Sequence, residues 1–264
     1  MNLQTAERDG TVGKALGVLD QVAGFGRPVR FAELLERSAH PKATLYRLIQ
    51  TLTSQGMLAY DPDRGTYALG LRLVRMAHGA WAQSSIAPIA RAHIDRLSAE
   101  VGETVHLAQL DGGQVLYVDK RNATRPIEMY SDAGKVGPAY CTGVGKAMLA
   151  FLPQAEQETV IAQQSFHRFT PGTLADPKSL RSELKAIAAR GHAYDREEHE
   201  PGIICIAMPI LSDQGRVRGA LSVTSSTART SLDALDGHLP LMRTTVSHIA
   251  QDLADWRFPD GAKA

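Results

Sequence analysis

Apolar residues recur at helical spacing in three short stretches near the start of the chain. These stretches cover residues 12–24, 31–37 and 41–54. Such spacing places the apolar side chains on one face of each helix. Pro41 stands at the start of the third stretch, where a helix tolerates proline because no N–H is needed there. The pattern predicts three short helices, with a tight turn at residues 38–40 between the second and the third.

The third helix is predicted to have an apolar face and a polar face. Its apolar face comprises Leu45, Leu48, Ile49 and Leu52. The residues on the opposite face and its flanks are Lys42, Ala43, Thr44, Tyr46, Arg47 and Gln50. Cationic and hydrogen-bonding side chains at such positions reach phosphates and base edges when a helix enters the major groove. We therefore expect this polar face to contact double-stranded DNA.

Two strand-like segments follow the third helix, at residues 57–60 and 66–69. Residues 61–65 (DPDRG) between them are typical of a turn, with Arg64 at its tip. Three helices followed by such a hairpin predict a winged helix-turn-helix DNA-binding domain. The alternative is an ordinary three-helix packing unit, whose polar residues face outward only because they meet water. The hairpin with Arg64 at its tip favours the DNA-binding interpretation.

The remainder of the chain mixes helices and strands without strict alternation. Helical spacing occurs at residues 70–82, 86–101, 142–152, 154–163, 177–190 and 232–256. Strand patterns occur at residues 104–110, 115–120, 127–131, 193–196, 203–211 and 218–224. Because hairpin turns such as residues 111–113 (DGG) join several strands, we predict an α+β fold with a mainly antiparallel sheet. The predicted domains are a winged helix-turn-helix at 9–70, a linker helix at 71–83 and a second domain at 84–258.

The net charge of the chain bears on its expected oligomeric state. The chain has 264 residues, with 29 Lys and Arg against 28 Asp and Glu. Residues 1–79 hold ten Lys and Arg against seven Asp and Glu, a net charge of +3. A single copy with so few cations would bind DNA weakly at physiological salt. We therefore expect a homodimer or homotetramer that combines several DNA-binding domains.

The sequence contains no pattern typical of export, membrane insertion or a structural metal. The N-terminal residues lack the apolar core of a signal peptide, and the longest apolar run, at 203–211, is too short to cross a bilayer. The two cysteines form no CxxC or Cys/His pattern. We expect a cytoplasmic protein that uses no cofactor and no metal and has no membrane partner.

The segment TGVGK at residues 142–146 opens a predicted helix. It is not a Walker phosphate-binding loop, because Tyr140 and Ala147 stand where that loop requires glycine and Ser/Thr. Two interpretations remain open: backbone N–H groups at the helix start bind a small anion such as a carboxylate, or the glycines only permit a tight turn. Residues 197–200 (EEHE) are interpreted as a charged loop rather than as a metal site.

The two cysteines allow an alternative interpretation, in which the protein is an enzyme. Cys141 precedes the glycine turn, where a helix N-terminus can lower the pKa of a thiol, whereas Cys205 lies in an apolar predicted strand. The alternative function is a small-acid hydrolase or transferase that uses Cys141 or Cys205, with the N-terminal unit as an interaction module. No Cys-His-Asp order supports it, so we predict no enzyme. A third possibility is a constitutive DNA-binding protein whose second domain only forms oligomers.

Four blocks of sequence together resemble the isocitrate lyase regulator (IclR) family of bacterial transcription factors. They are RPVRFAELLERSAHPKATLYRLIQTL with the following hairpin, PAYCTGVGKAMLAFL, GHAYDREEHEPGIICIAMPI and GALSVTS. The resemblance runs from about residue 10 to residue 257. It implies a winged helix-turn-helix, a linker helix and an effector-binding domain similar to GAF and profilin-like folds. It also implies homodimers or homotetramers that control a catabolic operon and respond to a small organic, aromatic or sugar acid.

The family's pocket positions transfer only where this sequence matches them. The resemblance implies an effector pocket lined by Met129, Gly143, Val144, Asp195, Cys205, Ser222 and Thr224. The backbone of Gly143 and Val144 would meet a carboxylate, and Met129 would form an apolar wall. Ser222 and Thr224 alternate on a strand, so both can face one cavity. Where many relatives have histidine just before the glycine turn, this chain has Tyr140-Cys141, a change at the expected pocket mouth.

Overall fold

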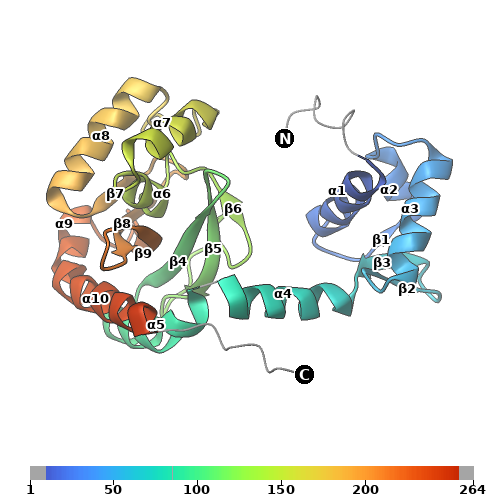
Figure 1. Cartoon of the computed structure of the whole chain (residues 1–264), viewed down its shortest axis with the longest axis horizontal. Helices are drawn as coiled ribbons and strands as arrows, with labels where there is room; N and C mark the ends of the chain where they lie inside the picture. Colours follow the sequence, from blue (N-terminus) through green and yellow to red (C-terminus); the bar gives the residue numbers. More distant parts are fainter. Residues whose placement is uncertain (1–9, 85, 256–264) are drawn as a thin grey trace. The chain divides into compact units, whose positions relative to one another are not determined.

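The computed structural model describes residues 10–84 and 86–255, which form two compact units that divide between Gln83 and Ser84 (Figure 1). The first unit combines short helices with a small sheet, and the second contains a larger sheet covered by helices. Within the described residues, no helix combines the length and the apolar character that crossing a bilayer requires.

The first unit is a winged helix-turn-helix. Its elements, followed by the long helix α4, are α1 (Thr11–Gly24), β1 (Val29–Arg30), α2 (Phe31–Glu36), α3 (Lys42–Ser54), β2 (Leu58–Asp61), β3 (Thr66–Leu69) and α4 (Leu71–Ser84). The strands form an antiparallel sheet in the order β1-β3-β2. The hairpin of β2 and β3 is the wing. The prediction of three helices and a hairpin is confirmed, with the ends of the elements moved by one or two residues.

One apolar core holds this unit together. Leu34 of α2 and Leu45 and Ile49 of α3 are fully buried in it. The end of α3 packs closely against the end of the wing: Gly56 has a φ of +70°, and a Cβ on Gly70 would lie 2.2 Å from the carbonyl oxygen of Gly56. Only glycine fits such a backbone approach. The helix-turn-helix and the wing are therefore fixed relative to each other by packing.

The second unit is built on a six-stranded antiparallel sheet in the order β6-β5-β4-β9-β8-β7. The strands are β4 (Thr104–Asp111), β5 (Gln114–Arg121), β6 (Val136–Gly137), β7 (Ala193–Arg196), β8 (Ile203–Leu211) and β9 (Val217–Ser226). The helices are α5 (Ala87–Val101), α6 (Gly143–Leu149), α7 (Gln154–Gln163), α8 (Pro177–Arg190), α9 (Leu232–Leu235) and α10 (Leu239–Asp255). The predicted α+β class with a mainly antiparallel sheet is confirmed.

Alternation along the strands gives the sheet two buried faces. The helices α5 and α10 cover one face, and α6 covers the other, with α7 and α8 beyond it (Figure 1). Large apolar side chains such as Ile206 and Val223 point to the first face. Small or polar residues, such as Ala207 and Ser222, alternate with them and point toward α6. The face toward α6 is thus the one with room for a site.

The predicted strand at residues 127–131 is wrong. No strand is present there, and the short strand β6 (Val136–Gly137) pairs with β5 instead. The backbone N–H of Tyr130 is bound elsewhere, because it donates to the carboxylate of Glu200 at 3.0 Å. A tertiary contact to a distant loop therefore replaces the ladder hydrogen bonds that the alternating sequence suggested.

Candidate functional site

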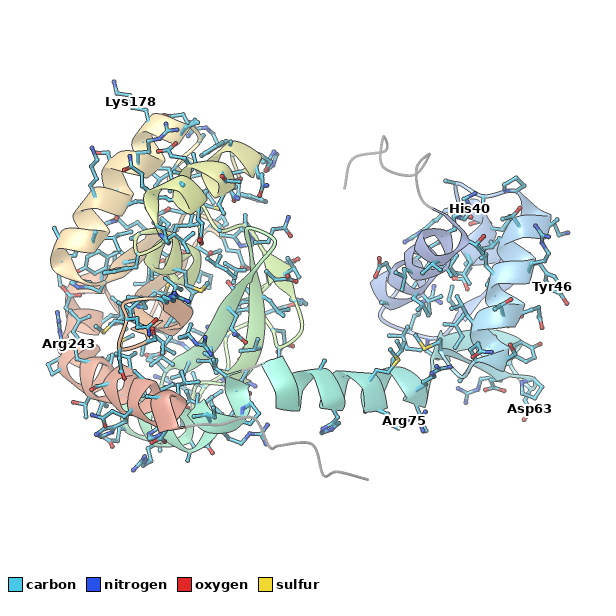
Figure 2. The ribbon with its side chains drawn as sticks, in the orientation of Figure 1. His40, Tyr46, Asp63, Arg75, Lys178 and Arg243 are labelled. Atoms are coloured by element: carbon cyan, nitrogen blue, oxygen red, sulfur yellow. The ribbon has the colours of Figure 1, made fainter. Side chains whose placement is uncertain are left out.

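The exposed face of α3 carries the predicted DNA-contact residues. Five of them are exposed, namely Lys42, Ala43, Tyr46, Arg47 and Gln50, and Thr44 is half-buried. Figure 2 shows Tyr46 pointing outward from the helix. Its ring lies edge-on to Phe31, with the ring centroids 6.0 Å apart. The aromatic contact holds Tyr46 at the surface in one direction, beside the cations of the same face.

The wing tip presents the seventh predicted residue, Arg64. The side chain of Asp61 organises the turn, because its Oδ1 accepts the backbone N–H groups of Asp63 and Arg64 at 3.0 and 3.2 Å. The Arg64 side chain is 79% exposed, and its Nε lies 3.8 Å from the other oxygen of Asp61. Such an exposed ion pair is weak. The guanidinium can therefore turn to another anion, such as a phosphate, at little energetic cost.

A cavity lies in the second unit between the sheet, the start of α6 and the loop after β7. Its lining residues are His106, Tyr117, Ser131, Thr142, Gly143, Val144, Asp195, His199, Glu200, Ile203, Cys205, Ser222 and Thr224. Its free space is about 30 Å³, which corresponds to room for about two water molecules. Segments that are more than 100 positions apart in the chain meet here.

Strand register brings the polar side chains of this cavity together. Thr224 of β9 is paired with Cys205 of β8, and Cys205 is paired in turn with Asp195 of β7. Ser222 lies two positions before Thr224 and is paired with His106 of β4. Side chains at such positions share one face of a sheet. The cavity floor is therefore a consequence of pairing between strands that are distant in sequence.

Gly143 closes this floor from the side of α6. A Cβ at this position would lie 2.4 Å from the sulfur of Cys205 and 3.3 Å from the side chain of Ala207. A residue with a side chain fits here only if the Cys205 thiol turns away. Close packing of Gly143 against the sheet is a further role, beside the anion binding and the tight turn that the sequence left open.

His106 is buried in the cavity and carries no charge. Its Nε2 lies 2.9 Å from the hydroxyl of Ser131, and its Nδ1 lies 3.3 Å from the hydroxyl of Thr224 and 3.4 Å from that of Ser222. Burial, assisted by the nearby Lys120, lowers the pKa of His106 to about 3. A neutral imidazole has one donor and one acceptor nitrogen. His106 therefore orients the hydroxyl groups around it without attracting an anion by charge.

Asp195 is the second titratable group of the floor. Its Oδ1 accepts the backbone N–H of Glu198 at 2.8 Å. Burial raises the pKa of Asp195 to about 7, although the ammonium of Lys146 opposes this rise. Near neutral pH the group is therefore divided between a carboxylate, which only accepts hydrogen bonds, and a carboxylic acid, which can also donate one.

Six of the seven predicted effector residues line this cavity together: Gly143, Val144, Asp195, Cys205, Ser222 and Thr224. Met129 does not line it; this residue is half-buried in the loop that was wrongly predicted as a strand. Five further lining residues were not predicted from the sequence: His106, Tyr117, Ser131, His199 and Glu200. One available signal was the alternation of Thr104 and His106 with apolar residues, which places two polar groups on the inner face of a predicted strand.

The thiols do not have the properties of nucleophiles. Burial raises the pKa of Cys141 and of Cys205, and the nearby carboxylate of Asp195 adds to the rise. The expectation that the helix start lowers the pKa of the Cys141 thiol is therefore wrong, because desolvation outweighs the short helix. Across the residues described by the structure, no three His, Cys, Asp or Glu side chains form a group able to hold a metal ion.

Comparison with known protein families gives matches for both units. Residues 78–251 match the family described as Bacterial transcriptional regulator IclR C-terminal. Residues 11–62 match the IclR helix-turn-helix domain. Together the two matches cover most of the chain.

Curated relatives are similar over nearly their whole length. The HTH-type transcriptional regulator XynR of Escherichia coli K12 is 32% identical over 219 residues, which is 83% of this chain and 87% of XynR. The HTH-type transcriptional regulator KdgR of Dickeya chrysanthemi is 30% identical over 246 residues, which is 93% of this chain and 80% of KdgR.

Solved structures show the same fold. The crystal structure of Thermotoga maritima IclR has a TM-score of 0.76 and 28% identity, covering 92% of this chain and 98% of that one. An IclR homologue from Microbacterium hydrocarbonoxydans, crystallised in complex with 4-hydroxybenzoate, has a TM-score of 0.81 and 24% identity, covering 94% of this chain and 100% of the homologue. At that identity the second likeness concerns the fold alone.

Proposed function

The chain belongs to the IclR family of bacterial transcriptional regulators, and we propose that a small organic acid bound in the cavity of the second unit sets its affinity for operator DNA. The controlled genes would form a catabolic operon that consumes this acid. The observation that carries the proposal is the convergence of Asp195, Ser222 and Thr224, with ten further residues, on one buried polar cavity.

The exposed face of α3 supports DNA contact through Lys42, Ala43, Thr44, Tyr46, Arg47 and Gln50, with Arg64 on the wing. In this arrangement Arg47 and Gln50 face base edges. Lys42, near the start of the helix, and Arg64, at the wing tip, contact phosphates. The buried residues of α3 keep this face rigid, so binding requires little ordering of the protein.

Exposed apolar side chains support assembly into a homodimer or homotetramer. Val12 and Leu16 on α1 are 74% and 53% exposed, and Leu71 and Val74 on α4 are 85% and 55% exposed. Apolar surface of this kind is typical of helices that pack against another chain. A second copy would cover it and would provide the second DNA-binding domain that the low positive charge calls for.

The chemistry of the cavity supports a small hydroxylated acid more than an aromatic one. Nine of its thirteen lining residues have polar side chains, and the free space of about 30 Å³ admits an acid of either kind only when part of the lining moves. A benzene ring offers these polar groups no hydrogen bond, and each buried group whose present partner it displaced would cost about 1–3 kcal/mol. Hydroxyl groups on the ligand would instead pair with Ser222, Thr224 and His106. Among the described lining residues no lysine or arginine is present, so backbone N–H groups and a protonated Asp195 would receive the carboxylate.

The enzyme alternative receives no comparable support. The raised pKa values of both thiols argue against a cysteine nucleophile, and the curated relatives described above are transcriptional regulators. A regulator needs only a coupling of about 1–3 kcal/mol between effector and operator. We propose that α4 transmits this coupling, because it is the helix that leads out of the DNA-binding unit.

A titration of operator binding tests this function. Fluorescence anisotropy would follow binding to promoter fragments from the neighbouring genes, with and without short hydroxy acids such as glycerate and pentonates, and with 4-hydroxybenzoate as the aromatic comparison. We expect Arg47→Ala to weaken binding about tenfold or more, since a lost base contact is worth about 1–3 kcal/mol. Arg27→Ala, which removes an exposed arginine outside α3 and the wing, is the matched control. Equal weakening by both variants, or no ligand effect in any fragment that binds, would contradict the proposal.

A further inference from the structure

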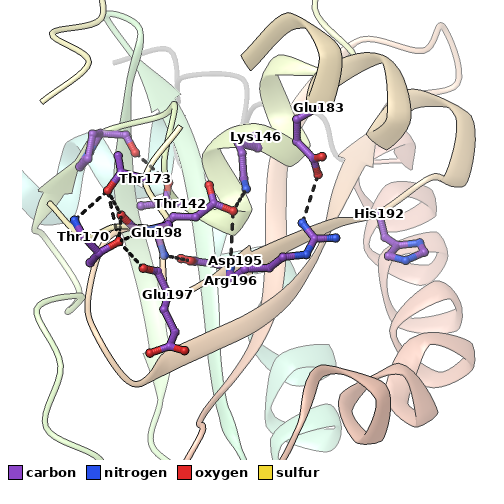
Figure 3. Close-up of polar contacts among 12 residues, drawn as sticks. Thr142, Lys146, Thr170, Thr173, Glu183, His192, Asp195, Arg196, Glu197 and Glu198 are labelled. Atoms are coloured by element: carbon purple, nitrogen blue, oxygen red, sulfur yellow. Dashed lines mark hydrogen bonds and ion pairs between the residues drawn. The ribbon is translucent and has the colours of Figure 1, made fainter. Parts of the chain in front are cut away.

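A buried ion pair lies beside Asp195 of the cavity floor (Figure 3). Lys146 of α6 is fully buried, and its ammonium donates a hydrogen bond to Oε1 of Glu198, which is 3% exposed. Neither side chain lines the cavity. Removing two charges from water is expensive, and a buried ion pair is often no more stable than two apolar residues of the same size. We therefore looked for a role of this pair other than stabilising the fold.

The pair joins the two walls of the cavity. On α6, Lys146 follows Gly143 by three positions, so both lie on neighbouring turns of one short helix. On the other side, Glu198 follows Asp195 by three positions, and its backbone N–H donates to Asp195 Oδ1 at 2.8 Å. One ion pair thus fixes the distance between the helix that carries Gly143 and the loop that carries Asp195.

Two threonines hold this loop from its outer side. The hydroxyl of Thr170 donates to the carbonyl oxygen of Glu197 at 2.6 Å, and that of Thr173 donates to the carbonyl oxygen of Glu198 at 2.6 Å (Figure 3). The backbone of Glu197 has a φ of +58°, a conformation that few residues other than glycine adopt. The loop is therefore constrained into one conformation, and it presents Glu198 to Lys146 from a fixed position.

Both members of the pair act electrically on Asp195, in opposite directions. The ammonium of Lys146 lowers the pKa of Asp195 and the carboxylate of Glu198 raises it, with His199 of the same loop lowering it further. The other titratable groups facing Asp195 are Cys141 before α6, Tyr117 of β5 and Cys205 of β8. Burial keeps all of these interactions strong. One oxygen of Glu198, Oε2, is buried without a hydrogen-bond partner among the described residues.

We propose that Lys146 and Glu198 are positioning residues of the effector pocket: they fix its two walls and set whether Asp195 meets an incoming acid as a carboxylate or as a carboxylic acid. A protonated Asp195 donates a hydrogen bond to the carboxylate of the effector, whereas an ionised Asp195 repels it. This inference rests on the proposed function only in taking the cavity as the effector site. The role of the pair toward Asp195 can be measured without any effector.

The test is a titration of Asp195 in the full chain, by nuclear magnetic resonance of carbon-13-labelled aspartate carboxyl groups. Asp195→Asn identifies the resonance. Glu198→Gln removes a neighbouring negative charge and leaves Lys146, so the Asp195 pKa should fall by about one pH unit or more. Lys146→Met removes the cation, so the Asp195 pKa should rise. The double variant Lys146→Met/Glu198→Gln should lie above wild type, because the lysine has the larger effect of the two.

Opposite shifts in the two single variants distinguish this role from a merely structural one, which would disturb both variants in the same way. Shifts in the same direction, or an unchanged Asp195 in both variants, would overturn the proposal. If Lys146→Met does not fold, Glu198→Gln and wild type decide the question: a lower Asp195 pKa in the variant supports the proposal, and an equal or higher one overturns it. Since no DNA or effector is present, a negative result here leaves the proposed regulation to its own test.

Discussion

The exposed face of α3 and the cavity of the second unit are both built from polar side chains, but they are built in different ways. Lys42, Arg47 and Gln50 all belong to α3, a single helix of thirteen consecutive residues. The cavity brings His106 and Thr224, which are 118 positions apart, to within 3.3 Å. Local geometry alone produces the first site, whereas strand register and helix packing produce the second.

This difference explains the different electrostatics of the two regions. Side chains on α3 remain in water, where charge is well solvated and individual interactions are weak. Asp195 and His106 are 7% and 2% exposed. Burial raises the pKa of Asp195 to about 7 and lowers the pKa of His106 to about 3. Under the proposed function, exposed charge would help α3 to attract a polyanion, while desolvated, hydrogen-bonded groups would help the cavity to discriminate among small acids.

The largest expected effect is a pH dependence of stability in the second unit alone. The folded-state pKa of Asp195, about 7, exceeds the ordinary 3.8, so the folded state holds this proton more tightly and stability is lost as the pH rises from about 4 to 7. The folded-state pKa of His106, about 3, is below the ordinary 6.5, so stability is lost as the pH falls below about 6.5. Each group contributes up to about 1.4 kcal/mol per pH unit.

Denaturant unfolding at a series of pH values measures these two opposed contributions. Relative to wild type, the unfolding free energy of Asp195→Asn should rise with pH between 4 and 7, and that of His106→Asn should fall with pH between 4 and 6.5. His40→Asn in the first unit is the control for loss of a histidine. If the unfolding free energies of both cavity variants instead ran parallel to wild type across this pH range, Asp195 and His106 would be as well solvated as the side chains on α3.

A smaller effect is expected from filling the contact between α6 and the sheet. Gly143→Ala places a methyl group 2.4 Å from Cys205 Sγ, and overpacking of this kind destabilises by about 1–3 kcal/mol. Removing the sulfur should relieve the clash, so Gly143→Ala/Cys205→Ala should be more stable than the sum of the two single variants predicts. Gly79→Ala is a control, because a Cβ there meets nothing within 4 Å. Additive effects in the cycle would show that Gly143 and Cys205 do not pack as described.

The sequence predicted the first region more completely than the second for a physical reason. Helical periodicity places Leu45 and Arg47 on opposite faces whatever the rest of the chain does, and both are found so. The long strands of the second unit were also predicted. A strand was wrongly expected at residues 127–131, where the N–H of Tyr130 binds Glu200, and the short strand β6 was missed. Which strands lie side by side depends on contacts between distant segments. The periodicity within one segment contains no information about those contacts.

The family resemblance supplied part of the missing information about the cavity. It brought Asp195, Cys205, Ser222 and Thr224 together before any register was known, and all four line the cavity. It did not supply His106, whose pairing with Ser222 follows from the alignment of β4 with β9. Met129 lies outside the lining of the cavity for a similar reason, because its position depends on the irregular loop after β5.

The smallest expected effect concerns the exposed face of α3 and distinguishes proposed phosphate contacts from proposed base contacts. Lys42 stands at the first position of α3 and is exposed, so we expect it to meet a phosphate rather than a base. Lys42→Ala should weaken binding to specific and non-specific DNA equally and reduce the salt dependence, the slope of log K against log salt, by about one per DNA-binding domain. Lys14→Ala removes the same charge from a different helix, α1, and should leave the slope unchanged. If Lys42→Ala instead lowered only the specific affinity, Lys42 would have to be counted with Arg47 among the residues that contact bases, and the start of α3 would have to lie deeper in the groove.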